Sequence, residues 1–501
     1  MMNRLARAIV IACFLAMPQT SCLLHSLKSD RPEQVVPSEG YRTVDKFPFK
    51  EAWYGMYFQE DKVGYSHFKI DPSGSNFTIA SDSFMRLTAL KKTNEIVMKE
   101  TVSVRPDLTM ISFQSEVRMN GKDLKMTGTT EAGRFLVDIK VDGETLNREY
   151  PIDGKVYHSS AISFMPALRG LGEGKAYTFG VFNAERQGMQ EVDQQVSKVK
   201  GEPGPNDAIW KVRNNYGRSV VHSWLDRKGL TVLEKGLDGS LVTVLEDEST
   251  AKKFREAKAR GKDLILDVSL IKVTPRLPNP EKLRFLRVRM QGIEPSVIAK
   301  DHRQRISLAS DKHSPGGFEV SVRTEDLDEF KSPRQRASSA PHSEEYLAST
   351  MTIQSDHKEI VSQAEKIVDD RDPPLDKVVK LVRWTAENIE NKLQDSFTAL
   401  AVLRSKEGEC QSHANLYAAL ARSRKIPTRV VTGLVYTNQG GFLYHAWAES
   451  YVNGWLAVDP TSKQIPADAT HIKIAAETGG DEASSLLKML GKTRIEVLEY
   501  K

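Results

Sequence analysis

Residues 408–414 read Gly-Glu-Cys-Gln-Ser-His-Ala and form the start of a predicted helix. On that helix Ala414, Tyr417 and Ala421 follow Cys410 at spacings of four, three and four residues, so they share its face. The thiol is therefore expected to point toward the domain core from the first turn. At a helix N-terminus, the dipole and the free backbone N–H groups favour a thiolate, and they can stabilise the oxyanion of a tetrahedral intermediate.

A thiolate nucleophile needs a base, and the base needs a partner that orients it. His445 lies 35 residues after Cys410, within a predicted strand at 443–452. Asp459 follows 14 residues later, at the end of the next predicted strand, 455–458. We therefore predict a catalytic triad with Cys410 as nucleophile, His445 as base and Asp459 as the group that holds the imidazole.

The loop between these two strands decides whether His445 and Asp459 can meet. A two-residue turn would place them on opposite faces, because side chains alternate along a strand. A three-residue loop pairs Tyr451 with Trp455 and makes His445 a diagonal neighbour of Asp459 on the same face, at roughly 7–8 Å between backbones. We predict the three-residue loop, with Gly454 in a left-handed conformation.

Other residues near the predicted triad have competing or simpler explanations. His413 is the alternative base, although from the same helix as Cys410 it would not reach a substrate beyond the sulfur. Gln411 could polarise a substrate carbonyl. We expect Glu409 to place a favourable charge in the first helical turn. Three further residues are expected to be structural or to form a cleft wall: His471, Trp447 and Trp455.

Four blocks of this region resemble the core of transglutaminase-like proteins. They are Gly-Glu-Cys-Gln-Ser-His-Ala at 408–414, Ile-Pro-Thr-Arg-Val-Val-Thr-Gly at 426–433, Tyr-His-Ala-Trp-Ala-Glu at 444–449 and Gly-Trp-Leu-Ala-Val-Asp-Pro-Thr at 454–461. The resemblance covers about residues 345–475 and follows the family's order and approximate spacing. It implies a papain-related fold with Cys410, His445 and Asp459 as a Cys-His-Asp triad. Bacterial members are commonly exported and are thought to act as cysteine peptidases, amidases or acyl transferases.

The fold class predicted for the whole chain is multidomain: a large, mainly antiparallel β region followed by an α+β transglutaminase-like (papain-like) domain. Runs of alternating residues at 110–119 and 135–141 precede hairpin signals at Asn120-Gly121 and Asp142-Gly143. Beyond residue 343 the hydrophobic period changes to 3.6, which indicates helices, and strands follow. The predicted segments are a signal peptide at 1–21, a tether at 22–48, a β-rich region of one or more domains at 49–330, a linker at 331–343 and the catalytic domain at 344–501.

The first residues are typical of an export signal. Arg4 and Arg7 precede an apolar run at 8–17 that is too short to span a bilayer. Cys22 follows, in a context that resembles the bacterial lipoprotein signal, in which this cysteine becomes the lipidated first residue. Gln19 departs from that pattern, which usually has leucine there. We expect a lipoprotein of the bacterial cell envelope, anchored to a membrane through Cys22 and facing the periplasm; a plain cleaved signal and an uncleaved anchor are the alternatives.

Cysteine content and charge narrow the function further. Only Cys410 of the three cysteines lies in the predicted folded body, since Cys13 falls in the signal and Cys22 at the start of the tether. An exported protein usually pairs its structural cysteines, so a lone thiol points to chemistry, with a small buried apolar residue as the alternative. A net charge of +5 over 501 residues is weak, and we expect no nucleic-acid partner. No metal-ligand spacing and no phosphate-binding glycine loop are present in the sequence, so no metal or organic cofactor is expected.

The predicted function is cleavage of an amide or peptide bond through a thioester on Cys410. Protein, peptide and peptidoglycan amides are all candidate substrates. Hydrolysis is favoured over acyl transfer, because no acidic cluster near the catalytic residues would obviously bind a cationic amine as acceptor. Glu449 is the nearest acid, and in a hairpin it can simply pair with a neighbouring residue. A transglutaminase-type acyl transferase and a non-catalytic cell-envelope binding or assembly protein are the alternatives. The sequence leaves the substrate and the oligomeric state open.

Overall fold

The structure is a computed structural model that describes residues 43–501 with internal gaps. The gaps are residues 59–60, 90–91, 120–121, 132, 142–143, 153, 184–187, 200–204, 217–218, 237–238, 257–269, 309–316, 332–343, 351, 393–397, 477–488 and 490–491. The predicted signal, Cys22, most of the tether and nearly all of the predicted linker therefore lie outside the described residues, as do the turn residues Asn120, Gly121, Asp142 and Gly143.

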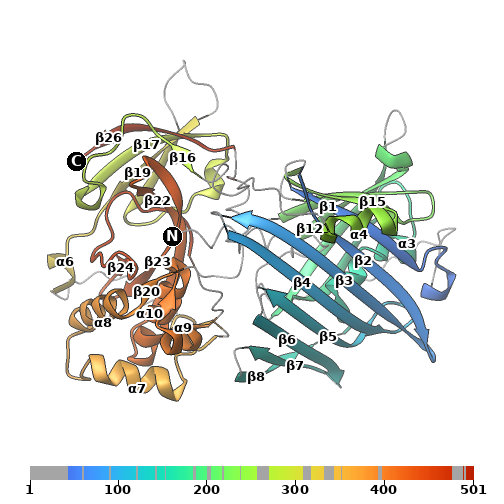
Figure 1. The fold of residues 1–501 in the computed structure, drawn as a ribbon, viewed down its shortest axis with the longest axis horizontal. Helices are drawn as coiled ribbons and strands as arrows, with labels where there is room; N and C mark the ends of the chain where they lie inside the picture. Colours follow the sequence, from blue (N-terminus) through green and yellow to red (C-terminus); the bar gives the residue numbers. More distant parts are fainter. Residues whose placement is uncertain are drawn as a thin grey trace.

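The first half of the chain forms one 15-stranded sheet (Figure 1). Its strands are β1 Glu51–Phe58, β2 Asp61–Ser73, β3 Asn76–Ala89, β4 Lys92–Val104, β5 Met110–Met119, β6 Lys122–Glu131, β7 Arg134–Val141, β8 Glu144–Pro151, β9 Tyr157–His158, β10 Ala176–Asn183, β11 Gly188–Lys198, β12 Trp210–Tyr216, β13 Ser219–Leu225, β14 Thr231–Gly236 and β15 Leu241–Glu246. Their spatial order is β8 to β1 in sequence, then β15 back to β9. Neighbours are antiparallel except for β9 and β10, so the predicted mainly antiparallel region is confirmed.

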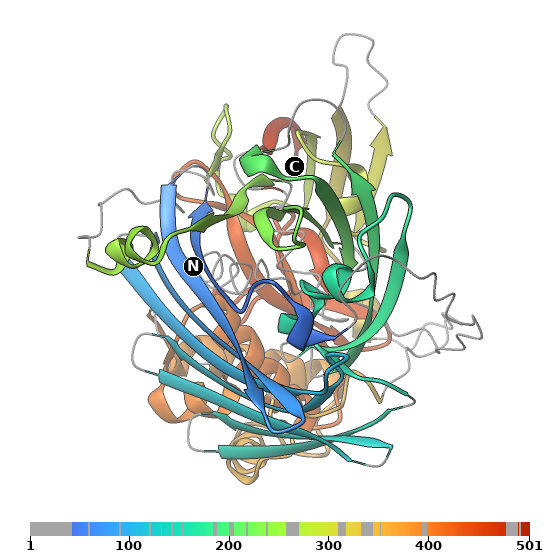
Figure 2. The same cartoon turned by 90° about the vertical axis from the view of Figure 1, so that its right-hand side faces the viewer.

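This sheet rolls up on itself, because a twisted sheet of this size must curl to cover its apolar face. The ring of Phe182 in β10 lies 4.6 Å from Phe135 in β7 and 5.8 Å from Phe113 in β5, which brings distant strands together. The backbone N–H of Met110 donates to the carbonyl of Val156 at 2.8 Å across the same junction. Figure 2 shows the curved strands wrapped around an interior. Among the residues that the structure describes in this half, three short helices accompany the sheet: α2 Ser159–Ile162, α3 Met165–Arg169 and α4 Glu248–Glu256.

The second half combines two smaller sheets with a group of helices. Its elements are β16 Ile271–Lys272, β17 Phe285–Gln291, β18 Gln304–Leu308, β19 Gly317–Arg323, α6 Asp328–Lys331, α7 Lys358–Ile367, α8 Pro374–Asn388, β20 Glu390–Asn391, α9 Ala399–Ser405, β21 Glu407–Gly408, α10 Cys410–Ser423, β22 Thr428–Thr437, β23 Gly441–Tyr451, β24 Trp455–Val458, β25 Ile472–Ala476 and β26 Arg494–Tyr500. One sheet has the order β16-β23-β22-β25, with β24 paired to β23, and the other has the order β18-β19-β17-β26.

Helix α10 is the centre of the second half. It contacts α7, α8 and α9 on one side and β22 and β23 on the other. All of its residues from Ser412 to Arg422 are buried, as is Cys410, so it is enclosed rather than amphipathic. The predicted α+β domain, with helices first and an antiparallel sheet after them, is confirmed.

Strand pairings cross the predicted boundary at residues 331–343. Strand β26, at the C-terminal end, pairs with β17, and β16 pairs with β23. A single apolar cluster also joins Met56 and Phe58 of the first sheet to Leu286 of β17 and Leu434 of β22. Residues 271–308 and 317–331 therefore pack as part of the second half, although they precede the predicted linker.

Candidate active site

Cys410 is the first residue of α10. Glu409 is the N-cap, and its carboxylate accepts a hydrogen bond from the backbone N–H of Gln411 at 3.0 Å. The sequence had indicated that Glu409 lies in the first helical turn. In the structure it precedes that turn, as the N-cap. The same carboxylate accepts from Cys410 Sγ at 3.5 Å. One of the backbone donors expected to serve an oxyanion is thus already engaged.

The hairpin that carries His445 and Asp459 has the predicted three-residue loop. Tyr451 pairs with Trp455, and the pairing continues to Ala448 with Val458. Gly454 has a positive φ of 152°, in the range that favours glycine, and Asn453 also has a positive φ, 56°, which is closer to the left-handed helical value. Asparagine tolerates the left-handed region better than other residues with a side chain, which explains this placement.

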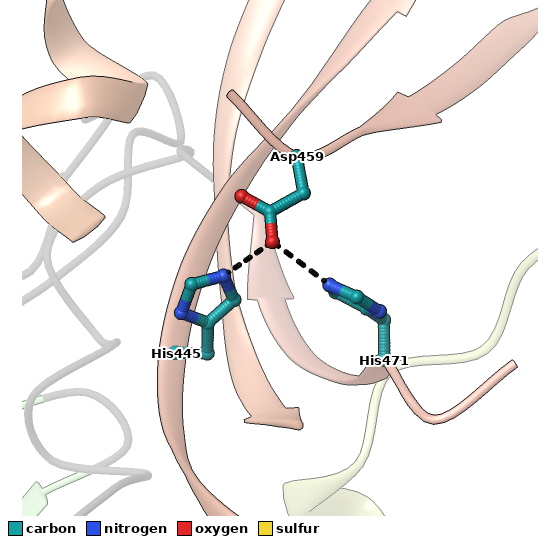
Figure 3. Close-up of side chains that lie close together, drawn as sticks. All are labelled: His445, Asp459 and His471. Atoms are coloured by element: carbon teal, nitrogen blue, oxygen red, sulfur yellow. Dashed lines mark hydrogen bonds and ion pairs between the residues drawn. The ribbon is translucent and has the colours of Figure 1, made fainter. Parts of the chain in front are cut away.

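With this loop, His445 and Asp459 meet (Figure 3). Nε2 of His445 donates to Oδ2 of Asp459 at 2.8 Å, and both side chains are buried. The other ring nitrogen, Nδ1, has no well-aligned hydrogen bond among the described residues. The thiol of Cys410 is nevertheless near enough to interact with this imidazole.

These neighbours set the pKa of the imidazole. Burial lowers the pKa of His445, but the Asp459 carboxylate and the Cys410 sulfur raise it more, so the net shift is upward. Burial likewise opposes ionisation of Asp459, yet His445 and then His471 hold the pKa of this carboxyl well below its usual range. These two shifts favour a charged His445 imidazolium beside the Asp459 carboxylate.

Asp459 also contacts a second histidine (Figure 3). Nε2 of His471 lies 3.3 Å from Oδ2 of Asp459, and Nδ1 of His471 lies 3.1 Å from Oδ1 of Asp468. Burial lowers the pKa of His471, but Asp468 and Asp459 raise it on balance. The sequence interpretation placed His471 among structural residues and missed this contact. The sequence did contain one indication of a histidine–carboxylate contact here, because Asp468 lies three residues before His471.

Residues 361–460 match the family model of the transglutaminase-like superfamily. This segment is a transglutaminase-like domain. The match includes Cys410, His445 and Asp459 and ends before His471.

Solved structures share limited similarity with the chain. One from Cytophaga hutchinsonii, named "Putative Cysteine Protease", is 17% identical with a TM-score of 0.29, over 43% of this chain and 85% of that chain. A "Beta-barrel-like Protein of Domain of Unknown Function DUF1849" from Brucella abortus is 14% identical with a TM-score of 0.28, over 39% of this chain and 94% of that one. A "Putative Protease" from Parabacteroides distasonis is 11% identical with a TM-score of 0.19, over 70% and 69%. No curated protein matches the chain.

Gly433 and Trp447 explain how His445 and His471 come close together. Gly433 pairs with His445 across β22 and β23. A Cβ atom at Gly433 would lie 2.0 Å from the carbonyl oxygen of Ile472 and 2.6 Å from the ring of Trp447. Only glycine therefore lets β25 and Trp447 approach this closely. The Trp447 ring is buried and lies parallel to His445 and edge-on to His471, so it is part of the core behind the two imidazoles.

Residues outside the matched segment brace the loop after Asp459. Nη2 of Arg303 donates to the carbonyls of Ala467 and Asp468 at 3.1 and 2.8 Å. Nη1 of Arg303 forms a buried ion pair with Glu325 at 3.2 Å, and Glu325 accepts from the backbone N–H of Ala457 at 3.0 Å. Arg303 and Glu325 thus hold the chain on both sides of Asp459.

The competing candidates near Cys410 are occupied elsewhere. Both ring nitrogens of His413 lie near backbone carbonyls, at 3.0 Å from Glu409 and 3.1 Å from Ile389, so this histidine does not face the thiol. The amide of Gln411 donates to Asn415 at 2.7 Å.

Glu449 is likewise occupied, by two cations. It is fully buried and binds Arg429 at 2.7 Å and Lys473 at 2.7 Å. Burial raises the pKa of Glu449, but the two cations lower it by more than this, so the resulting pKa is about 2. The pairing of Glu449 with a neighbour, rather than with a substrate amine, is the outcome the structure supports.

His445, Asp459 and His471 could also form a metal site. Their ligand atoms lie within 4.8 Å of one another, and two imidazoles with one carboxylate is a known zinc ligand set. However, both imidazoles already form hydrogen bonds with the Asp459 carboxylate, and Cys410 lies beside His445 as a triad requires.

No helix of the described residues is long and apolar enough to cross a membrane.

Proposed function

We propose that this protein is an exported cysteine-dependent enzyme that hydrolyses an amide or peptide bond. The observation that carries the proposal is the position of the His445 ring, between the Asp459 carboxylate on Nε2 and the Cys410 thiol at the start of α10. A non-catalytic envelope protein would have no use for all three groups in this geometry. Export through a lipidated Cys22 remains part of the proposal.

The reaction follows from these contacts. Nδ1 of His445 takes the proton of Cys410, and the thiolate attacks the carbonyl carbon of the amide. Nδ1 then donates this proton to the leaving nitrogen, the carbon–nitrogen bond breaks, and a thioester on Cys410 remains. Water attacks the thioester with Nδ1 as base, which releases the acid and restores the thiol. Asp459 keeps the proton on Nε2 throughout, so that Nδ1 is free to accept one.

Hydrolysis rather than transfer is favoured because an amine must be held by binding energy, whereas water needs no pocket. Glu449, the acid nearest to His445 along the strand, is neutralised by Arg429 and Lys473. We therefore expect that, with a primary amine present at millimolar concentration, most of the acyl-enzyme is still hydrolysed to the free acid. A dominant amine-linked product would replace the hydrolase with an acyl transferase.

The test is capture of the acyl-enzyme. The mature protein is mixed with peptide amides and with peptidoglycan fragments, and the Cys410 peptide is examined by mass spectrometry for an added acyl mass. Cys410→Ala should show no adduct and no product while retaining the circular dichroism of the wild type. His413→Gln is the matched control, because it removes a nearby imidazole that does not face the thiol. Loss of activity in the control together with unchanged activity in His445→Gln would reverse the assignment of the base.

A further inference from the structure

A cavity of about 100 Å³ lies within the rolled sheet of the first half. Its walls come from β1, β2, β3, β4, β14 and β15, the α2–α3 segment, and the turn before β14. About 10–15 Å³ holds one water-sized sphere, so the cavity has room for about seven to ten such spheres, the size of a small organic molecule. No residue of the transglutaminase-like domain contributes to its lining.

Two buried carboxyl groups line this cavity without a cation beside them. Glu100 is 6% exposed and Glu234 is 5% exposed. Oε2 of Glu234 accepts from Ser223 at 2.8 Å. Glu100 lies 3.6 Å from His158. None of the lining residues is a lysine or an arginine.

Glu100 and Glu234 accept hydrogen bonds from Ser160 and Ser223, respectively, but neither pairs with a lysine or an arginine among the described residues. Burial raises the pKa of Glu100 to about 8 and that of Glu234 to about 7. Burial also lowers the pKa of His158 to about 3, so this imidazole is neutral and does not compensate Glu100. A buried carboxylate without a counter-charge is costly, and an incoming cation would remove that cost.

The other titratable groups around the cavity supply no free positive charge. Tyr54 lines it, and burial raises the pKa of this phenol far above its usual value; the same holds for Tyr216, whose hydroxyl is near Glu234. His67 lies at 2.8 Å from both Asp82 and Glu51, so any charge that it carries is already shared with two carboxylates. An anionic ligand would therefore find only like charges here.

Aromatic rings complete the lining. Tyr54 stacks on Phe68 with ring centroids 6.3 Å apart, and Phe164 meets Phe68 edge-on at 4.8 Å. All three residues line the cavity. Ring faces attract cations and also bury apolar chains, so they suit a ligand with both features.

We propose that this cavity binds a small organic cation, an alkylammonium of up to about ten non-hydrogen atoms. Its charged group pairs with Glu100 or Glu234, and its alkyl chain packs against the three rings. The proposal is independent of the proposed hydrolase activity, because it involves none of the triad.

Isothermal titration calorimetry on the full mature protein tests it with three probes of one chain length: butylammonium, 1-butanol and butyrate. At pH 8 we expect butylammonium to bind at least tenfold more tightly than 1-butanol, and butyrate not to bind. Between pH 6 and pH 8 the affinity for butylammonium should rise, because both carboxyls lose their protons over this range. Equal binding of 1-butanol and butylammonium would overturn the proposal without any variant.

Variants then locate the site. Glu234→Gln and Glu100→Gln keep the shape of each side chain, and at least one should weaken butylammonium binding tenfold or more. Glu149→Gln is the control, because Glu149 is an exposed carboxylate of β8 that pairs with Arg134 on the surface. If both cavity variants bind butylammonium as the wild type does, the two carboxyls are structural and the cavity is not a cation site. If either variant still forms the acyl-enzyme, the cation-binding cavity and the hydrolase activity are independent of each other.

Discussion

Replacing Asp459 by asparagine tests the triad at its most heavily bonded residue. Oδ1 accepts from the backbone N–H groups of Thr461 and Ser462 at 2.8 and 3.3 Å. Oδ2 accepts from His445 at 2.8 Å, from His471 at 3.3 Å and from the hydroxyl of Ser462. An asparagine has a single carbonyl oxygen for these two sets of donors.

The backbone donors decide how the amide must turn. Since the N–H groups of Thr461 and Ser462 cannot reverse, the oxygen of Asp459→Asn stays with them and its NH₂ faces the imidazoles. Nε2 of His445 must then accept, which moves the ring proton to Nδ1, the nitrogen that should take the proton of Cys410. Loss of a buried charge-assisted hydrogen bond costs about 1.5–3 kcal/mol. We therefore expect iodoacetamide to alkylate Cys410 about 10- to 100-fold more slowly at pH 6, and turnover to fall by about 10⁴, the size seen for the wrong tautomer in a serine protease triad.

The assay is alkylation of Cys410 by iodoacetamide, which needs no knowledge of the substrate. Mass spectrometry of the Cys410 peptide separates it from the other two cysteines of the sequence. The wild type should react faster than a free model thiol at pH 6, and Asp459→Asn should be slower by the stated factor. Asp372→Asn is the control, since Asp372 pairs with Lys380 on the surface at 2.6 Å. A rate for Asp459→Asn within twofold of the wild type would refute the reasoning.

Three other predictions concern stability, pH and metals. Arg303→Met leaves Glu325 buried without its cation, so urea unfolding should show a loss of about 3–5 kcal/mol, and a loss below 1 kcal/mol would contradict the bracing role. Glu100 has its pKa raised from 4.5 to about 8, so its contribution to stability is present at low pH and disappears as pH rises toward 8; Glu100→Gln should flatten this decline in thermal unfolding, and an unchanged pH profile would argue against a buried carboxyl. A chelator such as EDTA should leave acyl-enzyme formation unchanged, whereas a loss restored by zinc would assign the two imidazoles and the carboxylate to a metal.

Much of the candidate site was open to prediction from local patterns. The helix that begins at Cys410 follows from its apolar spacing, and the three-residue loop follows from the alternation of side chains, which allows only an odd loop to bring His445 and Asp459 to one face. The predicted strand 455–458 is the observed β24. The predicted strand 110–119 is the observed β5. Such features depend on neighbours in sequence, and a periodic pattern records them directly.

The sequence by itself thus indicated the order of the elements in the second half, the three residues that we predict to form the triad, and the length of the loop between the strands that carry two of them. Only the tertiary structure decided that His471 shares Asp459, that Arg303 braces the loop around it, and that Glu449 is neutralised by Lys473. It also decided that β17 pairs with β26, far along the chain, and that the first sheet closes around Glu100 and Glu234. Each of these contacts joins residues whose separation leaves no periodic trace, because burial of charge and strand order are settled only when the sheets pack.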